Sequence, residues 1–500
     1  MKFRPTRLLF TLLLFVLFFA AMAYVQFSTP NLPDNDGFYH IKMAWLMRTQ
    51  GLKPAFPWLP LTILDPREFY DHHFLFHVAL IPFTFGDLVQ GAKWAAVTFA
   101  SLAFLSVWVL FEGQGVPLAW LWSLGLLGVS EAFLYRMSVT RAESLSLAIL
   151  VLTLSWILDE KYFRLSVLAF LYVWFYDAFP LILALAVLHL VAVALTERRL
   201  ELHPLTYVCA GLLLGMLINP YFPYNLIFTY RHLLPKLTSA TSISVGVEWY
   251  PYTTGQLLDN SLPALIAFIS GVFALGLAGR KMDLRTTLGL LVSLLFGFML
   301  FQARRFVEYF PAFALIFAAF AWSQFFQDRG LFRLDRSSFQ NALRGLRSWL
   351  PVGLLSAVVL IGTFISLQGA RKSINDSQPF GLYAGAASWL EHNTPSGARV
   401  FQTDWDDFPR LFFYNTNNTY LVGLDPSYMQ IADPALYDLW VKITQGRVKN
   451  LSEVIPARFG AEYIHTDLNH GGFINAAGQD GGLKEVYRDQ QAIIYQVVRP

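Results

Sequence analysis

Residues 8–45 decide the fold of this chain, because LLFTLLLFVLFFAAMAYV (8–25) is followed at once by QFSTPNLPDNDGFYHIKMAW (26–45). The first part is apolar over nearly the length, about 20 residues, that a helix needs to cross a bilayer. The second part places Asp34 and Asp36 directly after it, with a glycine and two aromatic residues behind them. The stretch therefore predicts a membrane-spanning helix with acidic residues at one membrane surface.

The composition extends this prediction to the whole chain. Of the 500 residues, 55% are hydrophobic and 14% are charged, whereas roughly a quarter of a soluble protein is charged. The net charge of +3 is too small to indicate a nucleic-acid partner. The single cysteine, Cys209, excludes an intramolecular disulfide. We expect an integral protein surrounded by membrane lipids, in which the first apolar segment is an uncleaved anchor rather than a signal peptide.

Apolar runs of about 16 to 21 residues recur as far as Leu367 and predict about eleven spans. They lie near residues 8–27, 92–111, 117–135, 143–158, 163–177, 178–196, 204–219, 262–279, 285–302, 306–325 and 350–367. The later stretches ARVFQT, NTYLVGL, AEYIHTD and QAIIYQVV predict strands instead. The fold class is therefore a polytopic α-helical membrane protein with a C-terminal soluble α/β domain. We expect the membrane domain over residues 1–369, with outer loops 28–91 and 220–261, and the soluble domain over residues 370–500.

The basic loops give the orientation. If the N-terminus is cytoplasmic, the inner loops are 159–164, 197–203, 279–285 and 328–349, which are the loops rich in Arg and Lys. Such loops stay on the cytoplasmic side. We predict an extracytoplasmic C-terminal domain, with the protein in a bacterial inner membrane.

The first outer loop carries candidate site residues. Asp36, with Asp34 near it, is suited to bind a hard cation or to accept a proton, although a solvated acid is the usual alternative. The stretch FYDHHFLFH places Asp71, His72 and His73 further along the same loop. Because no glutamate completes a known zinc motif, a hydrogen-bonded cluster is favoured over a metal site there.

Three later corners carry charges at membrane depth. Arg141 and Glu143 lie in SVTRAESLSL, and Glu248 lies in TSISVGVEWYPY. Arg304 and Arg305 lie in QARRFVEYFPAF, where an arginine can hold a phosphate through paired hydrogen bonds. Each charge has an alternative role as an interfacial anchor. All fall on the predicted outer face, and together they indicate a site for a lipid-linked, phosphate-bearing substrate.

With these motifs the sequence resembles the GT-C superfamily of membrane glycosyltransferases, and within it the catalytic subunit of oligosaccharyltransferases. NDGFYHIKMAWLMR is similar to the first acidic motif, SVGVE to the Ser/Thr-Val/Ile-x-Glu motif, RRFVEYFP to the Arg-Phe-x-x-Tyr segment, and DWDDFP to Trp-Trp-Asp-Tyr-Gly. The resemblance implies that Asp36 is the catalytic carboxylate and that Glu248 serves the metal and the acceptor. It also implies that Arg305 binds the lipid (pyro)phosphate and that Trp405 and Asp406 read the acceptor.

The second acidic motif departs from the family pattern, because Arg141 stands where the family has a metal-ligating acid. Glu143 then stands in for the second acid of that motif. The metal ligands implied for Mg²⁺ or Mn²⁺ are Asp36, Glu143 and Glu248. The candidates for binding the donor phosphate are Arg305, Arg304 and Arg141, the last of which can supply the positive charge in place of a metal.

The resemblance implies a glycosyltransferase that moves a sugar or oligosaccharide from a polyprenyl-(pyro)phosphate carrier, with inversion, on the extracytoplasmic side. The acceptor is a glycan, a lipid or a polypeptide, because the tail motif lacks one Trp, the Tyr and the Gly of the family. The alternatives are a transporter or flippase and an inactive scaffold of the same fold. A transporter is disfavoured because the spans lack the paired halves and midplane charges typical of that class.

Reporter fusions at Arg285 and Pro500 test the predicted orientation. Arg285 ends a basic loop and Pro500 ends the C-terminal domain, so the positive-inside rule places them on opposite sides. We expect an alkaline phosphatase fusion to be active only at Pro500 and a GFP fusion to fluoresce only at Arg285. The same side for both would contradict the predicted map.

Overall fold

The computed structural model describes residues 5–233, 246–279, 281–328 and 342–498. The chain forms two compact units, each assembled from three segments that are far apart in the sequence. Unit 1 comprises Met1–Thr29, Lys93–Gly215 and Gly246–Asp376, and unit 2 comprises Pro30–Ala92, Met216–Val245 and Ser377–Pro500. The domain boundary expected after residue 369 stays a prediction. Most of the basic loop 328–349, and Ser244 and Val245 of the SVGVE motif, lie outside the described residues.

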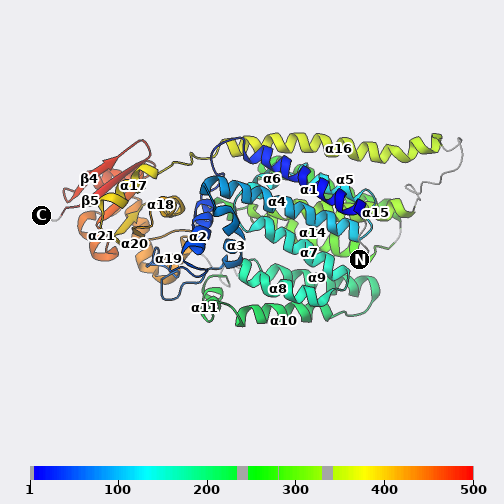
Figure 1. The fold of residues 1–500 in the computed structure, drawn as a ribbon, viewed down its shortest axis with the longest axis horizontal. Coiled ribbons are helices and arrows are strands. Elements are labelled where there is room, and N and C mark those ends of the chain that lie inside the picture. The colour runs from blue at the N-terminus through cyan, green and yellow to red at the C-terminus, as the bar shows by residue number, and fades with distance from the viewer. Residues whose placement is uncertain (1–4, 234–245, 280, 329–341, 499–500) are drawn as a thin grey trace. The chain divides into compact units, whose positions relative to one another are not determined.

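Unit 1 is helical. Its helices are α1 (Pro5–Gln26), α4 (Leu88–Gly113), α5 (Ala119–Leu124), α6 (Glu131–Ser138), α7 (Glu143–Leu158), α8 (Tyr162–Phe175), α9 (Pro180–Glu197), α10 (His203–Leu217), α13 (Thr254–Ala278), α14 (Leu284–Gln302), α15 (Phe310–Asp328) and α16 (Ala342–Asn375). The start of α4 and the end of α10 belong to unit 2. Within unit 1, α1 and α16 run side by side (Figure 1).

Six helices among the described residues are long and apolar enough to cross a membrane, and a seventh span arises if the bent pair α6 and α7 is counted as one. Four shorter apolar helices accompany them. Only 22% of the apolar stretch of α13 and 11% of that of α16 are buried within the protein, which leaves wide apolar surfaces for lipid. The predicted class of a polytopic α-helical membrane protein with a C-terminal α/β part is therefore confirmed.

The predicted span over residues 117–135 is interrupted and is not one helix. After α5, a 3₁₀ turn covers Gly125–Leu127, and α6 begins only at Glu131. The Oγ atom of Ser130 accepts a hydrogen bond from the N–H of Phe133 (3.0 Å) and caps α6. A serine N-cap followed by an acidic residue is a strong helix-start signal, which hydropathy alone overlooks.

The interrupted segment packs closely against α16. A Cβ atom on Gly128 would lie 2.6 Å from the nitrogen of Thr363 and 2.7 Å from the carbonyl carbon of Gly362, so the two backbones touch there. Small residues permit such approaches between helices in membranes. The contact requires glycine at position 128 and holds the turn before α6 against α16.

Unit 2 combines short helices with one sheet. The helices are α2 (Asp36–Gln50), α3 (Phe74–Leu80), α11 (Tyr224–Phe228), α17 (Ala384–Asn393), α18 (Phe408–Tyr414), α19 (Ser427–Ala432), α20 (Pro434–Thr444), α21 (Leu451–Phe459) and α22 (Gly471–Gly478). The strands are β1 (Arg399–Gln402), β2 (Thr419–Tyr420), β3 (Tyr463–Asp467), β4 (Leu483–Arg488) and β5 (Ala492–Val497). The strand order is β2-β1-β3-β5-β4, with β1 parallel to both β2 and β3 and the other pairs antiparallel.

The four predicted strands are β1, β2, β3 and β5, and β4 is the one that the sequence pattern did not predict. Phe401 and Ile464 from neighbouring strands are fully buried in a core that helices α20, α21 and α22 complete. β4 lies at the edge of the sheet and carries Lys484, Glu485 and Arg488. Charged side chains are suited to an exposed edge strand, but they obscure the alternation of apolar and polar residues by which a strand is predicted from sequence.

Gly128→Ala is expected to lower the thermal stability of the purified protein in detergent. The added methyl group meets the backbone of α16, and overpacking of this kind costs about 1–3 kcal/mol. Gly353→Ala is the matched control, because a Cβ atom at that position of α16 meets nothing within 4 Å. Equal melting temperatures for the two variants would contradict the proposed packing.

Candidate functional site

Four segments of unit 1 bring charged side chains together. α6 and α7 meet at an angle of 110°, which turns the corner between them sharply. Two 3₁₀ turns, η4 (Val247–Trp249) and η5 (Arg304–Glu308), complete the site, and η5 packs against α6, α7 and η4. The resulting group of side chains is called the arginine cluster. It consists of Arg136, Arg141, Arg305, Glu143, Glu248 and Glu308.

Glu248 lies at the centre of the arginine cluster. Its Oε2 atom is 3.0 Å from Nη1 of Arg136 and 3.4 Å from Nη1 of Arg141. Its Oε1 atom is 3.4 Å from Nη1 of Arg305. Three guanidiniums therefore share the two oxygens of one carboxylate, which is the kind of arrangement that arginines form around anions.

Glu143 and Glu308 are the buried partners of the same arginines. The Nε atom of Arg136 donates to Oε1 of Glu308 (2.6 Å), and its Nη2 atom contacts the same oxygen. The Oε1 atom of Glu143 lies 3.9 Å from Nη2 of Arg136 and 3.7 Å from Nη2 of Arg305. The side chains of Glu143 and Glu308 are only 5% and 1% exposed, and burial raises the pKa of the Glu308 carboxyl to about 7, although Arg136 beside it acts in the opposite direction.

Aromatic residues orient Arg305. Its guanidinium lies 4.3 Å from the centroid of the Trp249 ring, and its Nη2 atom donates to the hydroxyl of Tyr176 (3.1 Å). The Tyr176 hydroxyl also lies 3.5 Å from Oε1 of Glu143. The planar group is thus held from its face and from one edge, which leaves Nη1 directed at Glu248.

The three arginines determine the charge of Glu248. Burial disfavours the charged form of Glu248, but the three arginines outweigh it and hold the pKa of its carboxyl well below its usual range. Glu248 is therefore ionised at physiological pH. Glu248 is the most exposed of the six side chains at 27%.

Arg304 lies outside the arginine cluster, although the sequence places it beside Arg305 as a phosphate candidate. Its Nε and Nη2 atoms donate to the carbonyl oxygens of Tyr250 (3.2 Å) and Pro251 (3.1 Å). Its guanidinium also lies 5.2 Å from the centroid of the Tyr252 ring. Arg304 therefore fastens the backbone that follows Glu248.

In unit 2 the first acidic motif contacts the tail motif. Asp36 is the first residue of α2, where its charge complements the positive end of the helix dipole. The preceding Asn35 donates through Nδ2 to Oδ2 of Asp406 (2.7 Å) and accepts through Oδ1 from Nε of Arg410 (2.6 Å). Trp405 packs against the core of the C-terminal part. Two of the predicted motifs are therefore neighbours in space.

The histidines of the first outer loop form a buried hydrogen-bonded chain. Oδ2 of Asp71 lies 2.7 Å from Nδ1 of His77, and Nε2 of His77 lies 2.8 Å from Nδ1 of His40. Oδ1 of Asp71 accepts from the backbone N–H of His73 (3.0 Å), and the ring of His72 stacks on an aromatic ring of α11. These contacts tie α3 and the loop before it to α2.

The glutamates implied as metal ligands do not fit a divalent cation. Glu143 and Glu248 each face at least two guanidiniums at 3.0–3.9 Å. A divalent cation at their oxygens would be repelled by each of those guanidiniums by about 2–8 kcal/mol at contact distance, twice the value for two unit charges. Arg141 points at Glu248 and so adds to this repulsion. Asp36 and Asp34, the acids of the first motif, belong to unit 2.

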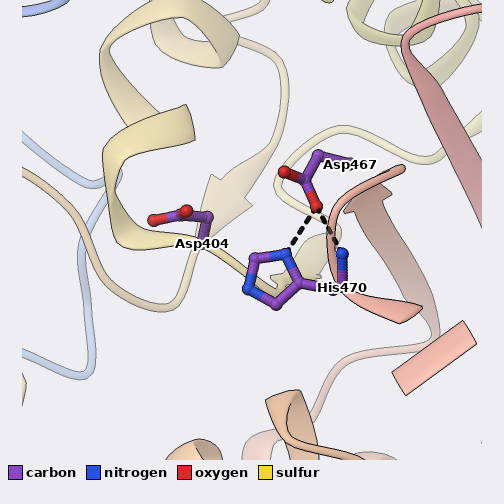
Figure 2. A group of neighbouring side chains, drawn as sticks. All are labelled: Asp404, Asp467 and His470. Atoms are coloured by element: carbon purple, nitrogen blue, oxygen red, sulfur yellow. Dashed lines mark hydrogen bonds and ion pairs between the residues drawn. The ribbon is translucent and has the colours of Figure 1, made fainter. Parts of the chain in front are cut away.

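A different group in unit 2, not predicted from the sequence, is spaced to hold a metal ion. Asp404, Asp467 and His470 offer ligand atoms within 4.8 Å of one another (Figure 2). Asp404 follows the end of β1, Asp467 is the last residue of the parallel strand β3, and His470 follows it. However, Oδ1 of Asp467 already accepts from Nδ1 of His470 (2.5 Å) and from two backbone N–H groups. This hydrogen bond raises the pKa of His470, which favours an ion pair over the neutral ring that metals bind.

Arg136 is the arginine of the cluster that the sequence analysis missed. It directly follows the span predicted over residues 117–135, where an arginine is usually a snorkelling anchor. The available signal was a second arginine, five residues before Arg141, in the corner YRMSVTRAE. The bend between α6 and α7 is what brings Arg136 to Glu308 and Glu248.

No family model and no curated protein matches the sequence. Solved structures match the fold. The oligosaccharyltransferase AglB from Archaeoglobus fulgidus, in complex with an inhibitory peptide and a dolichol-phosphate, aligns with a TM-score of 0.65 at 13% identity, over 98% of this chain and 74% of AglB. ArnT from Cupriavidus metallidurans, bound to undecaprenyl phosphate, aligns with a TM-score of 0.57 at 15% identity, over 99% of both chains.

A third match is the arabinofuranosyltransferase AftD from Mycobacteria, with a TM-score of 0.59 at 14% identity, over 98% of this chain and 40% of AftD. These neighbours are GT-C glycosyltransferases. At such low identities the likeness establishes the fold alone. The chain has the GT-C fold, as the resemblance of its motifs implied.

Proposed function

We propose that this membrane protein of the GT-C fold transfers a sugar or oligosaccharide from a polyprenyl-(pyro)phosphate carrier to an acceptor on the extracytoplasmic side. The observation that carries the proposal is the convergence of three guanidiniums on Glu248, each within 3.4 Å of its carboxylate. Guanidiniums arranged in this way suit a phosphate group. The dolichol-phosphate and undecaprenyl phosphate bound by AglB and ArnT support a lipid-linked donor.

The proposed reaction is one displacement at the anomeric carbon of the donor. The acceptor oxygen forms a bond to this carbon while the bond from the carbon to the phosphate oxygen breaks, leaving its electron pair on the phosphate. The acceptor proton passes to the carboxylate of Asp36, a role assigned from the first acidic motif at the start of α2. A single displacement inverts the configuration of the sugar.

The arginines act on the leaving group in this proposal. Negative charge grows on the phosphate as its bond to the sugar breaks, and donors that are already in place stabilise it without reorganisation. Arg305 meets this requirement best, because Trp249 and Tyr176 hold its guanidinium. Arg136 is held equally firmly by Glu308.

Asp406 and Trp405 are proposed to contact the acceptor. Asp406 is hydrogen-bonded to Asn35, the residue directly before Asp36, so the acceptor-reading and proton-accepting motifs support each other. Since the tail motif is incomplete, the proposed acceptor is a glycan, a lipid or a polypeptide rather than a peptide sequon in particular.

Arg305→Ala is expected to reduce transfer about 100- to 1000-fold, because one preorganised donor to the leaving group is lost. In cells that lack the protein, mass spectrometry of lipid-linked glycans identifies the donor that accumulates. Each variant is then produced in these cells, and its activity is measured as the decrease in that donor. Arg371→Ala is the control, since that guanidinium packs on Tyr24 and lies outside the arginine cluster. If the Arg305→Ala variant consumed the accumulated donor as fully as the wild type does, the arginine cluster would have no role in the reaction.

Asp36→Asn is expected to slow transfer by about 100- to 10,000-fold, as the loss of a general base does, while the thermal unfolding of the protein stays near that of the wild type. The same donor-accumulation assay measures the effect. Activity within about threefold of the wild type would exclude Asp36 as the base. Movement of the lipid donor across the membrane without sugar transfer by the wild type would instead favour a flippase.

A further inference from the structure

We propose that Asp71, His77 and His40 form a proton relay behind Asp36. In this relay the proton that the Asp36 carboxylate takes from the acceptor passes on to the imidazole of His40, and the positive charge comes to rest beside Asp71. The inference rests on the proposed function, because it begins from Asp36 as the base. It adds three positioning residues that act through Asp36.

The hydrogen bonds of the relay are continuous and buried. Oδ2 of Asp71 lies 2.7 Å from Nδ1 of His77, and Nε2 of His77 lies 2.8 Å from Nδ1 of His40. All three residues are at most 4% exposed. Ionisable groups are costly to bury unless they are hydrogen-bonded, and these contacts meet that condition. The two hydrogen bonds therefore lie away from bulk water.

The carboxylate at one end sets the direction of these hydrogen bonds. Both oxygens of Asp71 accept, Oδ1 from the backbone N–H of His73 (3.0 Å) and Oδ2 from Nδ1–H of His77. Because a neutral imidazole has one N–H, Nε2 of His77 then carries a lone pair and accepts from Nδ1–H of His40. The lone pair of a neutral His40 is consequently on its Nε2 atom. This atom is the basic end of the relay.

Helix α2 places His40 on the same face as Asp36. Asp36 is the first residue of the helix and His40 is four residues further on, and residues four apart are neighbours on a helix surface. Asp36 is half-buried and His40 is buried. The relay therefore leads inward from the carboxylate that is proposed to meet the acceptor, and its basic end is one helical turn away from that carboxylate.

The relay makes Asp36 more effective as a base. An aspartate in water has a pKa of about 3.9 and an imidazole one of about 6.5, and a base works best when its pKa is near the working pH. The proton on Asp36 passes to Nε2 of His40, while the proton on Nδ1 of His40 passes to Nε2 of His77. His77 then carries a proton on both ring nitrogens, and its positive charge faces the carboxylate of Asp71, which stays ionised.

Tyr39 and His73 are titratable groups that also face the relay. Their ring centroids lie 5.2 Å and 4.9 Å from that of His40. Burial raises the pKa of Tyr39, so its hydroxyl stays neutral. Of the other elements packed against α2, the 3₁₀ turn η1 (Ile81–Thr84) has no titratable side chain, and Arg410 of α18 lies over an aromatic ring of α2 at 4.4 Å. His73 is therefore the group whose titration has to be separated from that of the relay.

The test follows consumption of the lipid-linked donor as a function of pH. A detergent lysate of cells that lack the protein supplies the accumulated donor and the acceptor, and the purified full chain is added between about pH 5 and about pH 9, a range that includes the titration of imidazole. We expect wild-type activity to fall as the pH falls through the imidazole range, because a protonated relay has no lone pair to offer. Above that range the activity is expected to be level.

Two variants interrupt the relay in different ways. Asp71→Asn can keep both hydrogen bonds, but its amide donates to Nδ1 of His77, which reverses the tautomer of each ring and puts a hydrogen on Nε2 of His40. His40→Asn keeps a donor in place of Nδ1 but has no basic nitrogen. For each variant we expect about tenfold lower activity near neutral pH, and activity that rises steadily with pH as hydroxide replaces the relay. If Asp71→Asn does not fold, His40→Asn carries the test.

His73→Gln and Asp425→Asn are the matched controls. His73→Gln removes the titratable ring that faces His40. Asp425→Asn removes the acid from another buried Asp–His pair of unit 2, in which Oδ2 of Asp425 lies 3.3 Å from Nε2 of His232. Because neither residue belongs to the relay, both variants are expected to keep the wild-type pH dependence.

The outcomes separate the relay from the proposed function. Recovery of activity at high pH in the relay variants, but not in the controls, supports the relay. Wild-type pH dependence in Asp71→Asn and His40→Asn, or an equal loss at every pH, overturns the relay alone, because such a loss reflects structure only. Activity of Asp36→Asn within about threefold of the wild type overturns the assigned base and the relay with it. If the wild type consumes no donor at any pH, the proposed function itself is overturned.

Discussion

The need to neutralise three neighbouring guanidiniums shapes the rest of the site. Arginine keeps its charge at any physiological pH, so burial requires a counter-charge rather than loss of a proton. Glu143 and Glu308 supply two buried carboxyl groups, and Glu248 supplies a carboxylate from a separate turn. The ion pairs that meet this requirement connect the corner between α6 and α7 to the turns η4 and η5.

The corner itself depends on a contact between two helices. Gly128 lets the turn before α6 touch the backbone of α16, and α6 begins after this turn at the cap provided by Ser130. The 110° bend that follows places Arg136 and Arg141 on the two sides of one corner. Charges are costly at membrane depth, and a corner lets them pair at helix ends instead of facing lipid.

Several site residues were predictable and others were not. Glu248 and Arg305 were singled out as charges at outer corners, and their side chains lie 3.4 Å apart. Arg304 has the same sequence signal as Arg305 but binds backbone carbonyl oxygens. Arg136 looked like an anchor at the end of a span. These residues differ in the direction in which their side chains point. A 3₁₀ turn such as η5 sets side-chain directions that the periodicity of the sequence does not predict.

The sequence by itself determined the membrane class, six of the predicted spans as helices long enough to cross a membrane, four of the five strands that the structure describes, and the corners that carry charge, because hydropathy and residue period are local properties. Only the tertiary structure decided which charges pair. Arg136 meets Glu308 across 172 positions of sequence, and Arg141 meets Glu248 across 107. Such pairs follow from helix packing and from the bend at α6, which bring distant segments together. The same packing turned the expected metal ligands Glu143 and Glu248 into partners of arginine, since a carboxylate binds whichever positive charge the fold places beside it.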